Sequence, residues 1–125
     1  MRDAPVIAIV DDDESFREAL GRFLKTFAFR VRTFASGEEV LRSAELSVVT
    51  CLVLDVAMPG TSGLEVQERL RARGLRIPTV FVTAHADDEV VQQLAAGSIA
   101  ILAKPVDQEA LVRVLRGVVG GGDTA

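Results

Sequence analysis

The acidic residues that follow the first apolar run are the first candidates for chemistry in this chain. Asp11, Asp12, Asp13 and Glu14 come directly after residues 6–10, and they match in number the net charge of −4 carried by the 125 residues. Acids are favoured at a helix N-terminus, which accounts for Asp13 and Glu14. Asp11 and Asp12 lie between the apolar run and the start of the helix, so they need a different explanation.

Three more residues with reactive side chains stand at the ends of later apolar runs. They are Asp55 after residues 48–54, Thr83 at the end of 79–83, and Lys104 after 99–103. Taken singly, they would be a turn aspartate before a Pro-Gly pair, a β-branched strand residue and a surface lysine. If the runs are parallel strands, all of these side chains meet at one edge of a sheet.

Such a group of side chains suits phosphoryl chemistry. Two carboxylates a few Å apart repel by about 4 kcal/mol at an effective dielectric constant of 20, so the acids need a cation or a raised pKa. Oxygen ligands favour a hard ion such as Mg²⁺ or Mn²⁺. A free oxygen of Asp55 could then accept a phosphoryl group as an acyl phosphate, while Thr83 donates a hydrogen bond and Lys104 neutralises an oxygen.

The apolar runs and the segments between them predict an α/β fold. Four of the five runs are continuously apolar, as expected for strands buried on both faces of a parallel sheet. The run at 29–34 alternates arginines with apolar residues, which favours an edge position. We therefore predict a doubly wound (βα)5 open parallel sheet with strand order 2-1-3-4-5, a flavodoxin-like arrangement that binds ligands beyond the carboxyl ends of its strands.

Parallel strands require crossover connections, and the sequence carries a helix signal in each connecting segment. The signals are apolar stripes, capping residues and terminating glycines. The expected helices are one with an apolar stripe from Phe16 to Phe27, one opened by a Ser36/Glu39 capping box, two over about 63–73 and 87–96, and a last one capped by Asp107 that reaches Val119. Pro105 ends the last strand and is compatible with a cis turn.

Composition and charge limit the classes of function. The only cysteine, Cys51, lies in an apolar run, which predicts a core residue rather than a catalytic thiol, and His85 has no partner for zinc. The acidic balance gives no electrostatic reason to contact nucleic acid or a membrane, and no apolar run reaches the roughly 18 residues of a membrane span. We expect a cytoplasmic domain over residues 1–119 and a flexible tail or start of a linker over 120–125.

Four blocks of sequence, IAIVDDDE, LVLDVAMPGTSG, VFVTA and AKP, occur in an order that resembles the receiver domains of bacterial two-component response regulators. The stretches VRTFAS and DVAMPGTSGLEVQERL are most similar to FixJ-type receivers. The resemblance implies that Asp55 is the phosphoacceptor. It implies an acidic pocket of Asp11 and Asp12, in which Asp12, Asp55 and the backbone carbonyl of Ala57 hold Mg²⁺.

The same resemblance implies how such a domain works. A sensor histidine kinase supplies the phosphoryl group, and the domain is a phosphoacceptor rather than an enzyme, self-phosphorylating and self-dephosphorylating at most. Thr83 is the switch hydroxyl and Lys104 the phosphate contact; both shift a pre-existing equilibrium that controls an output domain or partner, with transcription as the expected target and a homodimer on phosphorylation. Ile101 occupies the switch position where the family usually has Phe or Tyr, which bears on the relay and not on the chemistry.

Two other classes of protein share part of this pattern. A haloacid-dehalogenase-type phosphohydrolase would use Asp11 and Asp13 after the first strand, but it needs a further acidic pair after the lysine and gives Asp55 no role. A flavodoxin-like binding module would need Ser, Thr or Gly after the first strand to cradle a phosphate, where this chain has acids. The receiver interpretation uses all of the strand-end residues.

Overall fold

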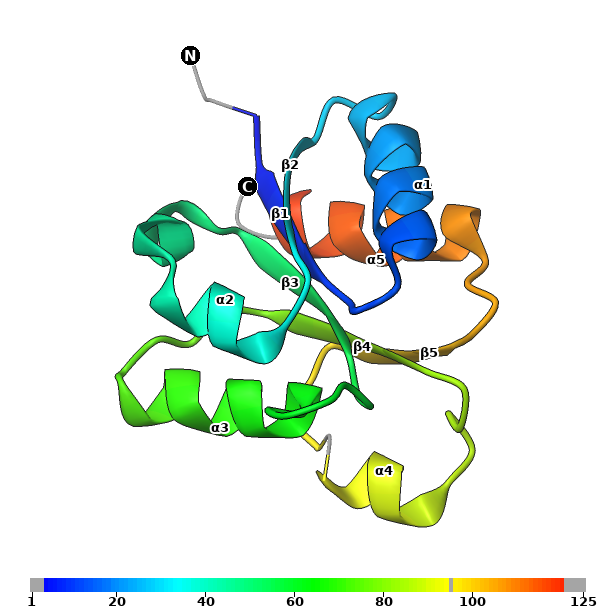
Figure 1. Ribbon diagram of the computed structural model, residues 1–125. Helices are drawn as coiled ribbons and strands as arrows, with labels where there is room; N and C mark the ends of the chain where they lie inside the picture. The colour runs from blue at the N-terminus through cyan, green and yellow to red at the C-terminus, as the bar shows by residue number, and fades with distance from the viewer. Residues whose placement is uncertain (1–3, 95, 121–125) are drawn as a thin grey trace.

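The computed structural model describes residues 4–94 and 96–120, and it contains a single five-stranded sheet (Figure 1). All strand pairs are parallel, and the order is β2-β1-β3-β4-β5. The strands are β1 (Val6–Val10), β2 (Arg30–Phe34), β3 (Cys51–Asp55), β4 (Thr79–Thr83) and β5 (Ala100–Ala103). The predicted fold class, strand order and edge position of the second strand are confirmed.

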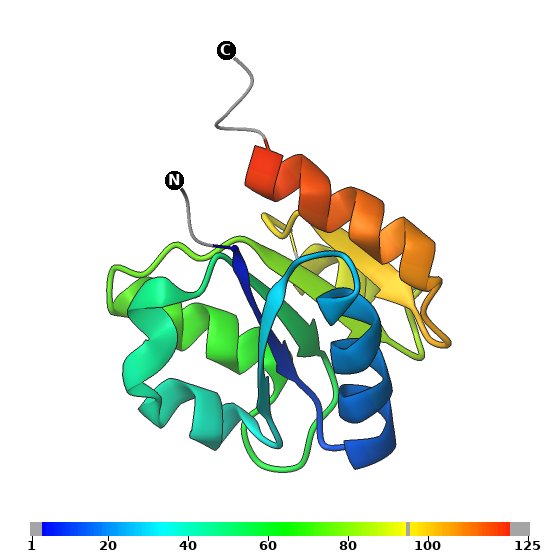
Figure 2. The same cartoon turned by 90° about the horizontal axis from the view of Figure 1, so that it is seen from above.

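Helices cover both faces of the sheet. They are α1 (Glu14–Lys25), α2 (Gly37–Arg42), α3 (Gly63–Ala72), α4 (Glu89–Leu94) and α5 (Gln108–Gly120), with a short 3-10 helix, η1, at Ala44–Val48. Figure 2 shows α1 and α5 on one face of the sheet and α2 and α3 on the other. This is the layered arrangement that a parallel sheet with helical crossovers requires.

The two faces carry two separate hydrophobic clusters because successive strand residues point to opposite sides. Ile7 and Ile9 of β1 pack with Leu20 and Leu24 of α1 and with Leu111 of α5. On the other face, the neighbouring β1 residues join α2 and α3; this cluster includes Ala8, Val10, Val40, Val66 and Leu70. Strands β1, β3 and β4 are fully buried, which explains their unbroken apolar sequences.

The helix starts agree only partly with their sequence signals. Ser36 accepts from the Glu39 backbone N–H at 3.1 Å, but the Glu39 carboxylate accepts from Ala35 instead of completing the capping box. The complete capping box lies at α3, where Ser62 and Glu65 bond reciprocally. This box was not predicted because its serine stands inside a turn-rich segment, PGTSG.

Two predicted elements begin more than one residue later than expected. The helix predicted over about 87–96 begins at Glu89, because Asp88 and not Asp87 accepts from the Val91 N–H and caps it. The run at 48–54 becomes a strand only from Cys51, because Ser43 caps η1 and that helix includes Val48. The last helix begins as predicted, with the Asp107 side chain accepting from the Ala110 N–H at 3.1 Å.

Cys51 is a core residue, as predicted. Its side chain is buried, and burial raises the pKa of the thiol to about 12. Because the thiolate is the reactive form, a neutral buried thiol has no nucleophilic role at ordinary pH.

None of the helices in the described part combines the length and hydropathy that a membrane crossing requires. Apart from Gly120, which ends α5, the tail predicted over 120–125 lies outside the described residues, and the expected boundary at 119 remains a prediction.

Leu115→Ala tests whether α5 is an integral part of the core. Leu115 is fully buried between α5 and the sheet, so its truncation should lower the free energy of unfolding by about 2–5 kcal/mol. Urea unfolding followed by circular dichroism measures this difference. Val48→Ala is the matched control, because Val48 is 55% exposed and should change stability by less than about 0.5 kcal/mol. Equal losses in the two variants would contradict the packing described here.

Candidate functional site

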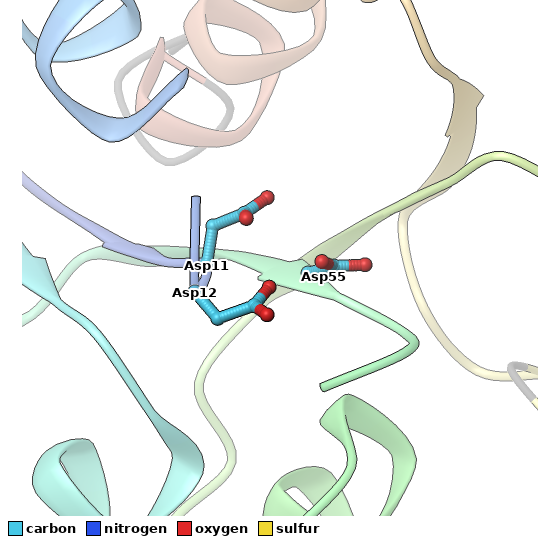
Figure 3. Close-up of side chains that lie close together, drawn as sticks. All are labelled: Asp11, Asp12 and Asp55. Carbon is cyan, nitrogen blue, oxygen red and sulfur yellow. The ribbon is translucent and has the colours of Figure 1, made fainter. Parts of the chain in front are cut away.

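The site lies where four parallel strands end at the same edge of the sheet. Asp11 follows β1, Asp55 ends β3, Thr83 ends β4 and Lys104 follows β5. The register aligns Val10 with Leu54, so the acids of β1 and β3 emerge side by side. Figure 3 shows Asp11 and Asp12 leaving the end of β1 next to Asp55.

Three carboxylates form the centre of the site. Asp11, Asp12 and Asp55 each offer an oxygen, and these oxygens lie within 4.8 Å of one another. Asp11 is 1% exposed and Asp55 6% exposed, whereas Asp12 is exposed. Two buried acids beside a solvent-facing third form a cluster that a cation can enter from the open side.

Lys104 is the cation that the protein itself supplies to this cluster. Its Nζ atom lies 2.8 Å from Asp11 Oδ2 and 3.2 Å from Asp55 Oδ2, and it donates a hydrogen bond to each. The same Nζ atom lies 4.8 Å from the centroid of the Phe16 ring on α1, a cation–π distance. The ammonium is therefore fixed between two buried acids and one aromatic face.

Burial and charge act against each other on these groups. Burial raises the pKa of Asp55, and the neighbouring Asp11 carboxylate raises it further, while Lys104 partly opposes both effects. Burial alone would lower the pKa of Lys104, but its hydrogen bonds and its attraction to Asp11 and Asp55 outweigh this, so the pKa is raised. Lys104 thus stays an ammonium, and any added cation would favour the anionic form of Asp55.

Backbone groups hold the two buried acids in place. Asp13 N–H donates to Asp11 Oδ1 at 2.9 Å, and Ala57 N–H donates to Asp55 Oδ1 at 3.1 Å. Each acid therefore bonds the residue two positions ahead and folds back over its own turn. For Ala57 the structure gives this N–H contact; the role of its carbonyl as a metal ligand remains a prediction.

The loop after Asp55 is held in place by hydrogen bonds to α2. Glu38 of α2 accepts from both the backbone N–H and the hydroxyl of Thr61, at 3.0 and 2.9 Å. Its own backbone N–H and these two bonds lower the pKa of Glu38. Gly63 begins α3 against the Asp55 carbonyl, in a space that a Cβ atom would fill. These contacts restrict the turn that carries Ala57.

Thr83 lies at the same edge but is not joined to the acidic cluster. Its hydroxyl oxygen accepts from the His85 N–H at 3.1 Å, and its carbonyl accepts from the Lys104 N–H at 2.9 Å. Among the described residues, no bond links its hydroxyl to Asp55 or to the Lys104 side chain. Ile101, two residues before the end of β5, is half-buried and packs against the cluster under α2 and α3.

Sequence reasoning missed two residues of α1 that contact the site. Phe16 was assigned only to the apolar stripe of the helix, yet its ring faces Lys104. Arg17 donates from its guanidinium to the Asp11 carbonyl at 2.7 Å. Neither contact has a local sequence signal, because both depend on how α1 packs beside the strand ends.

Comparison with known proteins assigns the chain to a family. The model of the response regulator receiver domain matches residues 7–116. The chain belongs to this family. It is thus a receiver of two-component signalling systems, a phosphoacceptor module with an acidic pocket at its strand ends.

The relatives of this receiver include a response regulator and a transcriptional regulatory protein. It is 37% identical over 114 residues to the response regulator TodT of Pseudomonas putida, covering 90% of this chain and 50% of TodT. It is 32% identical over 115 residues to the transcriptional regulatory protein FixJ of Azorhizobium caulinodans, covering 91% of this chain and 54% of FixJ. The chain thus spans about half the length of these relatives.

A solved structure that matches this receiver over nearly all of both chains has the same fold. The chemotaxis protein CheY4 of Vibrio cholerae superimposes with a TM-score of 0.84 at 26% identity, covering 92% of this receiver and 98% of that chain.

The positions of Asp13 and Asp55 weaken the phosphohydrolase alternative. Asp13, which it needs in the site, caps α1 by accepting from the Phe16 N–H, while Asp55 lies in the cluster.

The donor set of the cluster fits a divalent cation that prefers oxygen. Three carboxylates face one ammonium, and carboxylate oxygens are the ligands that Mg²⁺ and Mn²⁺ accept. Asp12, the exposed member, forms no ion pair within the described residues. Its charge is therefore open for an ion that enters from solvent.

Asp12→Asn should weaken binding of Mn²⁺ by about tenfold or more, because metal affinity follows the charge of the ligands. Asp13→Asn is the matched control: it removes the same charge one residue along, and asparagine keeps the helix cap. Isothermal titration calorimetry with Mn²⁺ measures both. An equal loss in the two variants would assign the effect to general charge and not to this cluster.

Proposed function

We propose that this receiver accepts a phosphoryl group on Asp55 from a sensor histidine kinase and thereby controls an output domain or partner in transcription. The observation that carries the proposal is the position of Asp55. It is a 6% exposed carboxylate, hydrogen-bonded to Lys104 and grouped with two further acids at the carboxyl edge of the sheet. A purely structural aspartate has no need of such surroundings.

The transfer itself is a displacement at phosphorus. A carboxylate oxygen of Asp55 forms a bond to phosphorus while the bond from phosphorus to the histidine nitrogen of the kinase breaks. The bonding electron pair leaves with the imidazole, and no redox partner is needed. Because little covalent chemistry is required of the protein, its main contributions are position and charge.

Two oxygens of Asp55 have different surroundings, which suggests a division of roles. Oδ1 accepts from the Ala57 N–H, and Oδ2 accepts from Lys104. The first bond fixes the orientation of the carboxyl group. Lys104 can transfer its hydrogen bond from Oδ2 to a phosphoryl oxygen once that oxygen carries the negative charge. Lys104 is already held within reach by Asp11 and Phe16, so this contact costs little reorganisation.

We propose Mg²⁺, or Mn²⁺ in its place, as the cofactor. Asp11, Asp12, Asp55 and the Ala57 carbonyl would hold it. When bound, the ion supplies positive charge to the carboxylates and to the oxygens of the phosphoryl group.

Thr83 is the proposed switch residue because its hydroxyl has a proton to donate. In the described residues the hydroxyl accepts one bond, from His85, and donates none. A new bond to a phosphoryl oxygen would draw it toward Asp55 and change its bond to the loop that precedes α4. That loop is tied to α4 by the Gln92 side chain, which donates to the Ala86 carbonyl at 3.0 Å.

The motion therefore has a physical route from β4 to α4. Inverting a two-state equilibrium from 1:99 to 99:1 takes about 5.5 kcal/mol, which a few charge-assisted bonds can provide. Ile101 is the neighbouring switch position on β5, and it offers a branched aliphatic side chain in place of an aromatic ring. We propose that the relay here runs through the Thr83 loop, with Ile101 as a packing contact.

The remaining parts of the proposal rest on the relatives and on the family. Both named regulators extend beyond the region that this receiver matches, which supports an output function in transcription. A homodimer on phosphorylation, a cytoplasmic location and the absence of nucleic-acid contacts by the receiver itself are proposals of the same kind.

Asp55→Asn should abolish phosphorylation. With Mg²⁺ and acetyl phosphate, the unmodified protein should gain the mass of one phosphoryl group, and the variant should gain none, because an amide oxygen is a poor nucleophile. Intact mass spectrometry reads the result. Asp107→Asn, an exposed helix cap at the same end of the fold, should be labelled normally. Labelling of the Asp55 variant, or turnover of phosphate monoesters that depends on Asp11 and Asp13, would overturn the proposal.

Thr83→Ala should separate phosphorylation from switching. The variant should still be labelled by acetyl phosphate, but its active population with beryllofluoride should fall by about tenfold, the effect of losing one hydrogen bond to a charged group. NMR shifts of Ala86 and Gln92 report that population. Thr83→Ser keeps the hydroxyl and should restore the shifts. Normal shifts in the alanine variant would show that the relay bypasses Thr83.

A further inference from the structure

A pocket lies at the amino edge of the sheet, opposite the acidic site. Its volume is about 260 Å³, and it is formed by the last turns of α3, the loop that leads to β4 and the turn before β5. Figure 1 shows the loop between α3 and β4 at the edge where the strands begin. The proposed phosphorylation chemistry makes no use of this pocket.

The polar groups of the pocket are cationic or hydrogen-bonding. Arg71 and Arg76 both line it, and both side chains are exposed. Within the described residues neither guanidinium forms an ion pair or a hydrogen bond, and the lining includes no Asp or Glu. Two positive charges in the lining of one pocket that contains no acid attract an anion.

Gln67 supplies a buried amide to the same pocket. It is 7% exposed, and its side chain forms no hydrogen bond with the described residues. No fully buried side-chain nitrogen or oxygen in the described part lacks a partner, so this amide must reach solvent. The pocket is the opening through which the Gln67 amide reaches solvent. A mostly buried amide that has no protein partner and opens into a cationic pocket can donate a hydrogen bond to a ligand there.

The walls of the pocket are apolar. Leu70 is buried, and Leu75 and Ile77 pack against the cluster under α2 and α3. Ile99 also lines the pocket, and it is a large apolar residue that is 43% exposed. A simple inorganic ion would leave this surface in contact with water.

The Arg71 side chain of α3 also lies close to the turn that precedes β5. A Cβ atom added to Gly97 would come within 2.9 Å of an Arg71 guanidinium nitrogen, and Gly97 has a φ of +95°. The arginine of α3 therefore lies directly over the backbone of the turn before β5. A side chain at residue 97 would push the guanidinium away, so this glycine keeps the cationic end of the pocket compact.

We propose that this pocket binds a small organic acid, with its carboxylate on Arg71, Arg76 and the Gln67 amide and its apolar part against Leu75 and Ile99. The planar fork of arginine matches a carboxylate, and the amide adds a donor. The apolar walls select an organic body over a bare ion. The proposal is independent of Asp55, which lies at the other end of the strands.

Benzoate is a suitable probe because it combines a carboxylate with a flat apolar ring. In ¹⁵N NMR titrations of the protein, benzoate should give saturable shifts of the Gly97 and Ile99 amides and of the Gln67 side-chain amide, with a Kd on the order of 1 mM. Benzamide, which has the ring without the charge, and inorganic phosphate, which has charge without the ring, should each bind about tenfold more weakly. Equal binding of either compound would contradict an organic-anion site.

Variants locate the contacts. Arg71→Gln should weaken benzoate binding by about tenfold, while Arg22→Gln, an exposed arginine of α1, should leave it within twofold. Gln67→Leu keeps the volume and removes the amide, so it should also weaken binding. Spectra of the free variants confirm that each is folded. Absence of saturable shifts, or shifts that survive Arg71→Gln, would overturn the proposal, and phosphorylation by acetyl phosphate should be normal in every variant.

Discussion

The contact of Lys104 with two buried carboxylates is the interaction on which the functional edge of this receiver depends. Asp11 and Asp55 emerge from neighbouring strands, and two such charges a few Å apart would repel strongly in a site of low dielectric constant. The ammonium bonds both, at 2.8 and 3.2 Å, and Phe16 closes one side of it. One cation does not neutralise three acids. The site is thus partly neutralised by Lys104 and still carries excess negative charge, which is the condition that the proposed metal ion and phosphoryl chemistry needs.

The parallel sheet gives the molecule two chemically different ends. Every strand begins at one edge and finishes at the other, so residues just after strands gather together, as do residues just before them. The acids of β1 and β3 occupy the finishing edge, and arginines of α3 and of the following loop occupy the starting edge. Strand β4 connects the two ends directly, because Thr79 lines the pocket and Thr83 lies beside the acids.

Much of this arrangement could be predicted from the sequence because it follows from periodicity. The unbroken apolar runs of β1, β3 and β4 indicated burial on both faces, and the alternating arginines of β2 indicated an edge. Together they were enough to bring Asp11, Asp12, Asp55 and Lys104 to one place. Contacts between elements had no such signal: Phe16 over Lys104, Arg17 on the Asp11 carbonyl and Glu38 on Thr61 all depend on helix packing. The pocket has no sequence signal for the same reason, since arginines on a helix resemble an ordinary solvated face.

The four strand ends that build the acidic site also connect its occupancy to the stability of the whole domain. Because Asp11, Asp55, Thr83 and Lys104 come from different strands, an unfolded chain has no trace of their arrangement. Any ligand that binds them therefore binds the native state alone and adds RT ln(1 + [L]/Kd) to the free energy of unfolding, about 2.7 kcal/mol at a hundredfold excess over Kd. A divalent cation bound at this cluster would therefore link metal concentration to folding stability, and it would slow proteolysis that proceeds through the unfolded form.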